Sequence, residues 1–247
     1  MRRLVPFALG FGVALLLAPA TFAQIPDQFT NLKVLPKDMP KRELVNMMRG
    51  FAGALGVRCN HCHVGESTTS LEGFDFASDD KETKRVARAM LQMTNEINGK
   101  LLPTIGRESP IQVRCATCHR GVTKPQALDQ ILLAEVAKGG APAAVARYRE
   151  LRTQYYGTGS YDFSGRSMNT VAETLARGEK NFDAAVALMQ LHIEFNPDKA
   201  DAYISLGQLY SMKGDKEAAI TALERAVALE PENAQAKQML ESARSGK

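Results

Sequence analysis

The pattern Val-Arg-Cys-x-x-Cys-His occurs twice in the chain, and it limits the possible folds more than any other feature. It runs from Val57 to His63 and again from Val113 to His119. The two motifs hold all four cysteines of the 247 residues. Each motif follows an apolar stripe at helical spacing, so the sequence predicts a duplicated unit of helix, loop and cysteine motif.

Both stripes repeat about once per helical turn. The first consists of Leu44, Met48, Phe51 and Leu55, and the second of Val86, Met90, Met93 and Ile97. We expect the first helix to begin after Asp38 and Pro40 and to end near Gly56. We expect the second helix to begin with a capping box of Asp79 and Glu82 and to stop at Gly99.

Four kinds of chemistry use closely spaced cysteines: zinc binding, disulfides, redox dithiols and covalent haem attachment. The 52 residues between Cys62 and Cys115 are long for a small zinc ribbon. A thioredoxin-like dithiol needs a βαβ context, which this sequence does not show. Short disulfides would leave the histidine after each cysteine pair unexplained. Covalent haem accounts for both thiols and the histidine together, so we expect two c-type haems.

The haem interpretation gives each motif residue a role. Thioether attachment is predicted for Cys59, Cys62, Cys115 and Cys118. His63 and His119 are the predicted proximal ligands of the two irons. His61 lies between two cysteines, where we expect it to face solvent or pack at an edge.

Methionines are the best candidates for the distal ligands, because a methionine sulfur completes haem coordination and raises the reduction potential. Met48 and Met90 lie on the two stripes, with Met47 and Met93 as alternates. The other interpretation is that these methionines only fill the core. His192, the one histidine outside the motifs, is expected to be packed within the C-terminal repeats.

At this point the sequence resembles a family, the cytochrome c subunit of photosynthetic reaction centres and its non-photosynthetic relatives. The resemblance rests on Glu43–Met48, Arg88–Leu91, Ile97–Asn98 and Cys115–Gly121, and it covers about 100 residues of the chain. It implies an axial methionine on the helix before each motif, at Met48 and Met90. The family subunit typically has four haem units and this chain has two, so the resemblance implies electron transfer without implying service to a photosystem.

The N-terminus is typical of a secretory signal. Arg2 and Arg3 precede the apolar run from Leu4 to Leu17, and small residues precede a cleavage site after Ala23. We therefore expect residues 1–23 to be removed and the mature protein to be exported, in a bacterium to the periplasm. The alternative is an uncleaved membrane anchor; no other segment is apolar enough to span a membrane.

The C-terminal part repeats with a period of 34 residues, since Ala185 and Ala219 are 34 apart, as are Pro197 and Pro231. The second copy matches the tetratricopeptide pattern at Tyr203, Leu206, Gly207, Tyr210, Gly214, Ala219, Leu223, Ala226 and Pro231. The first copy, 166–199, is degenerate, and 234–243 is expected to form a closing helix. Helices at 127–137 and 142–155 are expected to pack beneath the repeats, because two copies are few for independent stability.

Together these patterns predict an all-α protein with four parts. The parts are a signal at 1–23, a loop-rich di-haem domain at 24–125, a helical connector at 126–165 and repeats at 166–247. The predicted function is electron transfer between redox partner proteins, with the repeats as a docking surface. The alternatives are a di-haem peroxidase-like enzyme, and a repeat scaffold whose haems are sensory or structural.

Further side chains and surfaces carry weaker expectations. Haem propionates could pair with Arg58, Arg114 and Arg120, which could equally be solvated. A solvated loop is expected around Glu72, Asp75, Asp79 and Asp80. The net charge of +4 and the lack of a basic, aromatic-rich block do not favour nucleic-acid binding.

Overall fold

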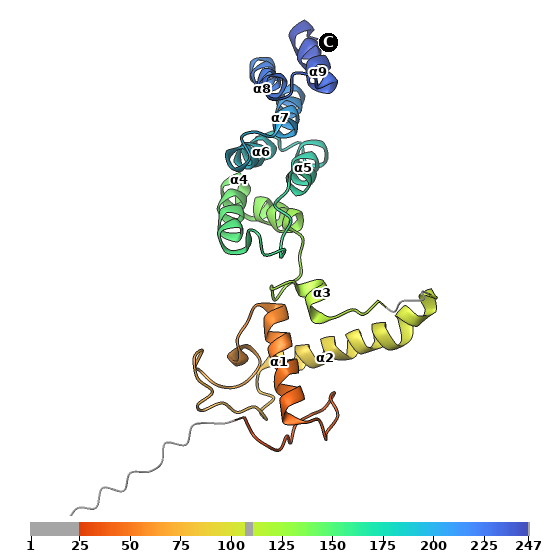
Figure 1. The fold of residues 1–247 in the computed structure, drawn as a ribbon. Helices are drawn as coiled ribbons and strands as arrows, with labels where there is room; N and C mark the ends of the chain where they lie inside the picture. The colour runs from red at the N-terminus through yellow and green to blue at the C-terminus, as the bar shows by residue number, and fades with distance from the viewer. Residues whose placement is uncertain (1–24, 107–110, 247) are drawn as a thin grey trace, which may run out of the picture. The chain divides into compact units, whose positions relative to one another are not determined.

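The computed structural model describes residues 25–106 and 111–246, so the predicted signal at 1–23 lies outside the described residues. Over these ranges the chain is helical and contains no β-strand, which confirms the all-α prediction (Figure 1). The chain divides into two compact units. The first is Met1–Asn46 with Arg58–Glu96, and the second is Met47–Val57 with Ile97–Lys247. This division does not follow the predicted boundary at residue 125.

Helix α1, Lys41–Leu55, follows Pro40 and ends before Gly56, as the stripe predicts. Leu44 is buried, whereas Met48, Phe51 and Leu55 are half-buried. Gly56 has a φ of 67°, in the left-handed region that glycine adopts without steric cost. The sequence therefore located this helix correctly from local signals alone.

Helix α2, Glu82–Glu96, begins at the residue that the capping-box prediction placed inside the first turn. That prediction is wrong, because the carboxylate of Asp79 binds Lys33 and Arg88 instead of capping the helix. The predicted stop at Gly99 is also wrong. The chain continues as a π-helical turn, Ile97–Leu101, and a 3-10 turn, Leu102–Ile105, until Gly106 takes a φ of 69°. A glycine in a helix is a weak stop signal unless the backbone there becomes left-handed.

The connector forms α4, Leu128–Tyr155, which is broken at its middle. Gly139 and Gly140 have non-helical dihedrals, and Pro142 follows them. The break agrees with the prediction of two connector helices, at 127–137 and 142–155. Its buried side chains share one apolar core with the repeat helices, including Leu132, Tyr148 and Leu188. The expectation that the connector supports the repeats is therefore confirmed.

Five further helices make the repeat region of the second unit (Figure 1). They are α5 Gly165–Glu173, α6 Phe182–Phe195, α7 Ala200–Lys213, α8 Lys216–Leu229 and α9 Ala234–Ser245. The degenerate first copy carries a π-helical turn, Thr174–Gly178, after α5. A Cβ atom at Gly207 would lie 2.6 Å from the side chain of Leu223, so glycine allows α7 and α8 to pack closely. Helix α9 confirms the predicted closing helix.

Within the described residues, no helix combines the length and apolarity that a membrane span requires.

Candidate functional site

The first cysteine motif folds as a single tight turn. Cys59–His61 form a 3-10 turn, and the amide of His63 donates to the carbonyl of Cys59 over 3.0 Å. Cys59 is exposed, Cys62 is half-buried, and both are free thiols. Burial raises the pKa of the Cys62 thiol. The turn presents both thiols and the His63 imidazole within five consecutive residues, as covalent attachment of one haem requires.

The start of α2 holds the first motif in place through its backbone. The ammonium of Lys81 donates to the carbonyl of Asn60, and the hydroxyl of Thr83 donates to the carbonyl of His61. His61 is half-buried, in agreement with the edge-packed position expected for it. Its backbone, not its imidazole, therefore makes the contact that organises the motif.

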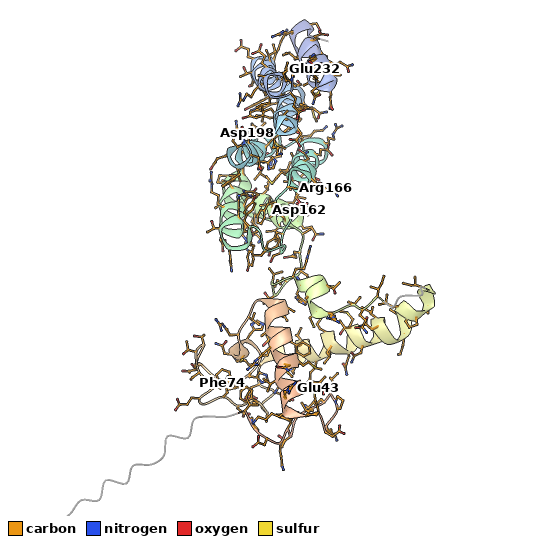
Figure 2. The ribbon with its side chains drawn as sticks, in the orientation of Figure 1. Glu43, Phe74, Asp162, Arg166, Asp198 and Glu232 are labelled. Carbon is orange, nitrogen blue, oxygen red and sulfur yellow. The ribbon has the colours of Figure 1, made fainter. Side chains whose placement is uncertain are left out.

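The His63 ring packs edge-on against Phe76, with 5.1 Å between ring centroids. Phe76 in turn stacks on Phe74, which Figure 2 labels. The Nδ1 atom of His63 is buried and has no hydrogen-bond partner among the residues that the structure describes. Burial lowers the pKa of His63, and the nearby charge of Lys84 lowers it further. The imidazole is therefore favoured in its neutral form, the form that binds iron.

A polar network behind Phe76 holds this aromatic group against His63. The buried ammonium of Lys84 donates to the carbonyls of Phe76 and Ser78, at 2.8 and 2.5 Å. It also lies 3.5 Å from the carboxylate of Asp79. Because the ammonium has three or more acceptors, their hydrogen bonds offset the free-energy cost of removing this charge from water. The sequence patterns did not identify Lys84, since a lysine on a helix is normally solvated.

Asp79 is the centre of this network. Its carboxylate accepts hydrogen bonds from Lys33, Arg88 and Asn31, at 2.5, 2.7 and 2.9 Å. These hydrogen bonds, first from Lys33 and then from Arg88, hold the pKa of Asp79 well below its usual range. The expectation of a solvated acidic loop is thus wrong for Asp79, which joins the N-terminal segment to α2.

The second motif forms a short helix, α3, Cys115–His119. The hydroxyl of Thr117 accepts the amide of Arg114 over 3.0 Å, which fixes the start of the turn. The Nδ1 atom of His119 lies 2.9 Å from the carbonyl oxygen of Val122. Because a carbonyl only accepts, Nδ1 carries the proton and Nε2 is the nitrogen left for a metal. His119 is therefore oriented by its own loop, in contrast to His63.

The side chain of Asn98 clamps the residue that leads into the second motif. Its amide nitrogen donates to the carbonyl of Val113 over 2.8 Å, and its oxygen accepts the amide of Val113 over 2.7 Å. The two hydrogen bonds resemble those between paired β-strands, and they satisfy both the amide and the carbonyl of Val113. In the sequence, Asn98 is marked only by the family resemblance of Ile97–Asn98, and no local pattern indicates this contact.

Little apolar side-chain area is buried around the motifs. Among the described residues up to 125, the buried hydrophobic residues are Leu44, Ala54 and Val122. On α2, Val86, Met90 and Met93 are 47%, 41% and 46% exposed. Such a stripe is unfavourable in water unless an apolar group covers it. Haem fits this environment, because its porphyrin supplies the large apolar surface that the protein side chains lack.

The structure leaves the distal ligands as a prediction. Each predicted methionine belongs to a different unit from the histidine of its own motif. Met48 is in the second unit and His63 in the first, whereas Met90 is in the first and His119 in the second. Met47 is half-buried like Met48, and Met93 is exposed like Met90. Roles for the exposed Arg58, Arg114 and Arg120 toward propionates also remain predictions. His192 is buried in α6, as expected for a packed histidine.

Comparison with known proteins agrees with the chemistry of the motifs. A family model for the photosynthetic reaction centre cytochrome C subunit matches residues 18–157, more than half of the chain. A tetratricopeptide repeat model matches residues 170–231.

Individual relatives cover smaller parts of the chain. Cytochrome c-554 of Chloroflexus aurantiacus is 34% identical over 73 residues, which is 30% of this chain and 16% of that protein. The photosynthetic reaction center cytochrome c subunit of Rubrivivax gelatinosus is 28% identical over 110 residues, 40% of this chain and 28% of its own length. That of Roseobacter denitrificans is 34% identical over 102 residues, 40% of this chain and 26% of its own length. The chain therefore matches less than a third of each of these relatives.

Among solved structures, the first tetratricopeptide domain of Spaghetti (RPAP3), bound to an HSP90 peptide, is 21% identical. It has a TM-score of 0.33 and covers 48% of this chain and 89% of that chain.

Proposed function

Because the chain belongs to the family of photosynthetic reaction-centre cytochrome c subunits, with a tetratricopeptide region after it, we propose that it is an exported electron-transfer protein with two covalent haems. Membership of this cytochrome family implies c-type haem. The number of haems, their ligands and the periplasmic location belong to the proposal. The observation that carries it is the repeated Val-Arg-Cys-x-x-Cys-His, each copy folded as one turn with its histidine half-buried.

Each motif residue has a distinct task in this proposal. The paired thiols bind the porphyrin edge covalently, which holds the group even where the surrounding core is thin. His63 and His119 offer imidazole nitrogens to the two irons. Reversible one-electron transfer is the chemistry that the bound haem supplies. The apolar stripe on α2 and the aromatic pair Phe74 and Phe76 would exclude water around a porphyrin that covers them.

Methionine ligation at Met48 and Met90 is the second part of the proposal. A filled distal position leaves the iron no open site for a substrate, which favours electron transfer over peroxidase-like chemistry. Thioether sulfur also favours reduced iron, so both haems would work at relatively high potential. Two motifs, in place of the four typical of the reaction-centre subunit, favour a carrier or relay outside a photosystem.

The repeat region is proposed as the docking surface for a redox partner. A shallow groove between α5 and α7 is lined by Asn169, Glu173, Arg177, Gln208 and Met212 among others. Met212 is among the exposed large hydrophobic residues, at 37%. An exposed methionine among polar side chains is typical of adaptable protein-binding surfaces.

Mass spectrometry of the intact purified protein, combined with its reduced absorption spectrum, tests the haem and export proposals together. We expect two haem additions on a chain that starts at Gln24. Low-spin spectra in both oxidation states, unchanged by carbon monoxide, would agree with methionine ligation. One haem, none, or high-spin iron at rest would contradict the corresponding part of the proposal.

Reduction kinetics test the docking surface. The Met212→Glu variant should be reduced by ascorbate at the wild-type rate, since small donors need no docking. Its reduction by a periplasmic extract of the host should be slower. If the extract reduces wild type and Met212→Glu at the same rate, the groove is not the docking surface.

A further inference from the structure

A pocket of about 530 Å³ lies within the second unit, and its lining includes no residue of the cysteine motifs or of the groove between α5 and α7. It is formed by the end of α4, the loop at 157–164, the start of α5, the end of α6 and the start of α7. The side chains that matter to its chemistry are Arg152, Tyr156, Tyr161, Phe163, His192 and Lys199. Its volume is in the range of sites that hold small organic molecules. The electron-transfer proposal gives this pocket no role.

Arg152 brings a positive charge to the pocket without a partner of opposite charge. Its guanidinium lies 3.9 Å from the ring centroid of Tyr156 and 4.4 Å from that of Phe195. Stacking occupies the faces of the guanidinium and leaves its N–H groups, which lie in the plane, available. No carboxylate in the described part of the chain is within ion-pair distance of Arg152 or Lys199. Both cations can therefore bind an added anion.

His192 offers a buried hydrogen-bond donor to the same pocket. The residue is 3% exposed. The side-chain nitrogen of Asn196 donates to the carbonyl of His192 over 2.9 Å and lies 3.3 Å from its Nδ1. Since that nitrogen is a donor, Nδ1 accepts and the ring proton of neutral His192 is on Nε2. Nε2 has no hydrogen-bond partner in the described residues, and it lies 3.4 Å from the position of a Cβ atom at Gly165.

Asp201 is the one carboxylate among the residues that line the pocket. Its Oδ1 accepts the amide of Ala202 over 2.9 Å, at the start of α7. The lining of the pocket therefore holds two cations and a histidine donor but a single acidic group. This balance of charge favours an anionic ligand, and a carboxylate matches the planar N–H edge of Arg152.

The pocket loop is held in shape before any ligand binds. The buried hydroxyl of Ser160 donates to the carbonyl of Arg120 over 2.6 Å, and Thr158 donates to Ser160 over 2.9 Å. At the other end, the carboxylate of Asp162, labelled in Figure 2, accepts the amide of Ser164 over 2.9 Å. A loop ordered in advance reduces the entropy lost on binding.

We propose that this pocket binds a small aromatic carboxylate. The carboxylate would lie against Arg152, Lys199 and Nε2 of His192, and the ring against Tyr156, Tyr161 and Phe163. Aromatic side chains beside a stacked guanidinium favour a flat ligand, because its ring can stack where a branched aliphatic chain cannot. The site is a ligand site additional to the two haem sites, and it does not depend on electron transfer.

Titration calorimetry of the full-length holoprotein with benzoate tests the proposal, with benzamide as the neutral control of the same shape. We expect one benzoate per chain, and binding of benzamide at least about tenfold weaker, because a charge-assisted hydrogen bond contributes on the order of one tenfold step or more in affinity. No binding of benzoate, or equal affinity for benzamide, overturns the proposal.

Two variants locate the site. Lys199→Gln removes an exposed charge and should weaken benzoate binding about tenfold, whereas Lys237→Gln on α9 should leave it unchanged. Gly165→Ala places a methyl group next to His192 and Asp201, without backbone strain, and should weaken binding at least about tenfold while thermal stability is kept or raised. Wild-type affinity in both Lys199→Gln and Gly165→Ala would show that benzoate binds elsewhere and would overturn the proposal.

Discussion

The amide of Gly121 donates to the carbonyl of Ala54 over 2.8 Å, so the loop after the second cysteine motif closes directly onto the end of α1. The contact is made backbone to backbone. A Cβ atom at Gly56 would lie 2.2 Å from the carbonyl oxygen of Gly121, closer than any real contact. The helix that leads into the first motif is thereby joined to the loop that leaves the second.

Substituting Gly56 with alanine should break this junction. The new methyl group meets a carbonyl oxygen, and Gly56 has a φ of 67°, which costs a non-glycine residue on the order of 1 kcal/mol or more even without the clash. We expect Gly56→Ala to lower the free energy of unfolding by at least about 2 kcal/mol, measured by urea denaturation.

Gly53 is the matched control for Gly56. It lies inside α1, and a Cβ atom there meets nothing within 4 Å. Gly53→Ala should therefore stabilise the protein by about 0.5–1 kcal/mol, because alanine is the better helix former. Equal effects of the two substitutions would mean that the junction contributes no stability.

Replacing Met48 or Met90 with alanine should leave one haem without its distal ligand. We expect one of the two haems to become high-spin and to bind carbon monoxide, and its reduction potential to fall. Absorption spectra and a potentiometric titration measure these changes. Met47→Ala and Met93→Ala serve as controls with the same loss of side-chain volume, and both should keep two low-spin haems. High-spin iron in a control variant would instead identify the methionine replaced in that variant as the distal ligand.

Asn98→Ala should destabilise the approach to the second motif. The substitution removes both partners of the Val113 backbone, and each unsatisfied group costs about 1–3 kcal/mol when it is shielded from water. We expect a lower melting temperature and a lower haem content, measured by calorimetry and by the ratio of haem to protein. Asn95→Ala, at an exposed position on α2, should change neither quantity. A normal haem content in Asn98→Ala would mean that attachment does not require this clamp.

The carboxylate of Asp79 should make stability depend on pH in the acid range. Its pKa is lowered in the folded protein, so the unfolded chain takes up this proton at a higher pH than the folded one. The contribution is complete above the ordinary aspartate pKa of about 3.9 and is lost as the pH falls below it toward the lower folded value.

Urea unfolding at pH 6 and pH 3 measures the contribution of Asp79. The stability difference between wild type and Asp79→Asn should be larger at pH 6. Asp80→Asn, whose side chain makes no ion pair in the described residues, should show little difference at either pH. If the stability difference between wild type and Asp79→Asn is the same at pH 6 and pH 3, the carboxylate of Asp79 is not the source of the pH dependence.

The parts of the fold that were predictable depend on short stretches of sequence. The two helices of the connector, the end of α1 at Gly56 and the 34-residue repeat are all set by local backbone preferences or by periodicity. The predicted roles of the motif residues rest on local sequence in the same way, since two thiols and a histidine lie within five positions. The two mistakes, at Asp79 and at Gly99, concern helix ends, where a distant charge or a continued π-helical turn replaces the expected cap.

By itself, the sequence determined that this chain is helical, duplicated around two cysteine motifs and followed by helical repeats. The tertiary structure decided which polar groups meet: Asn98 with Val113, Asp79 with Lys33, Arg120 with Ser160, and His192 with the pocket beside Arg152. The physical reason is the range of the interactions. Helical periodicity and haem attachment involve neighbours within a turn, whereas these contacts join residues 15 to 46 positions apart and exist only once the chain has packed.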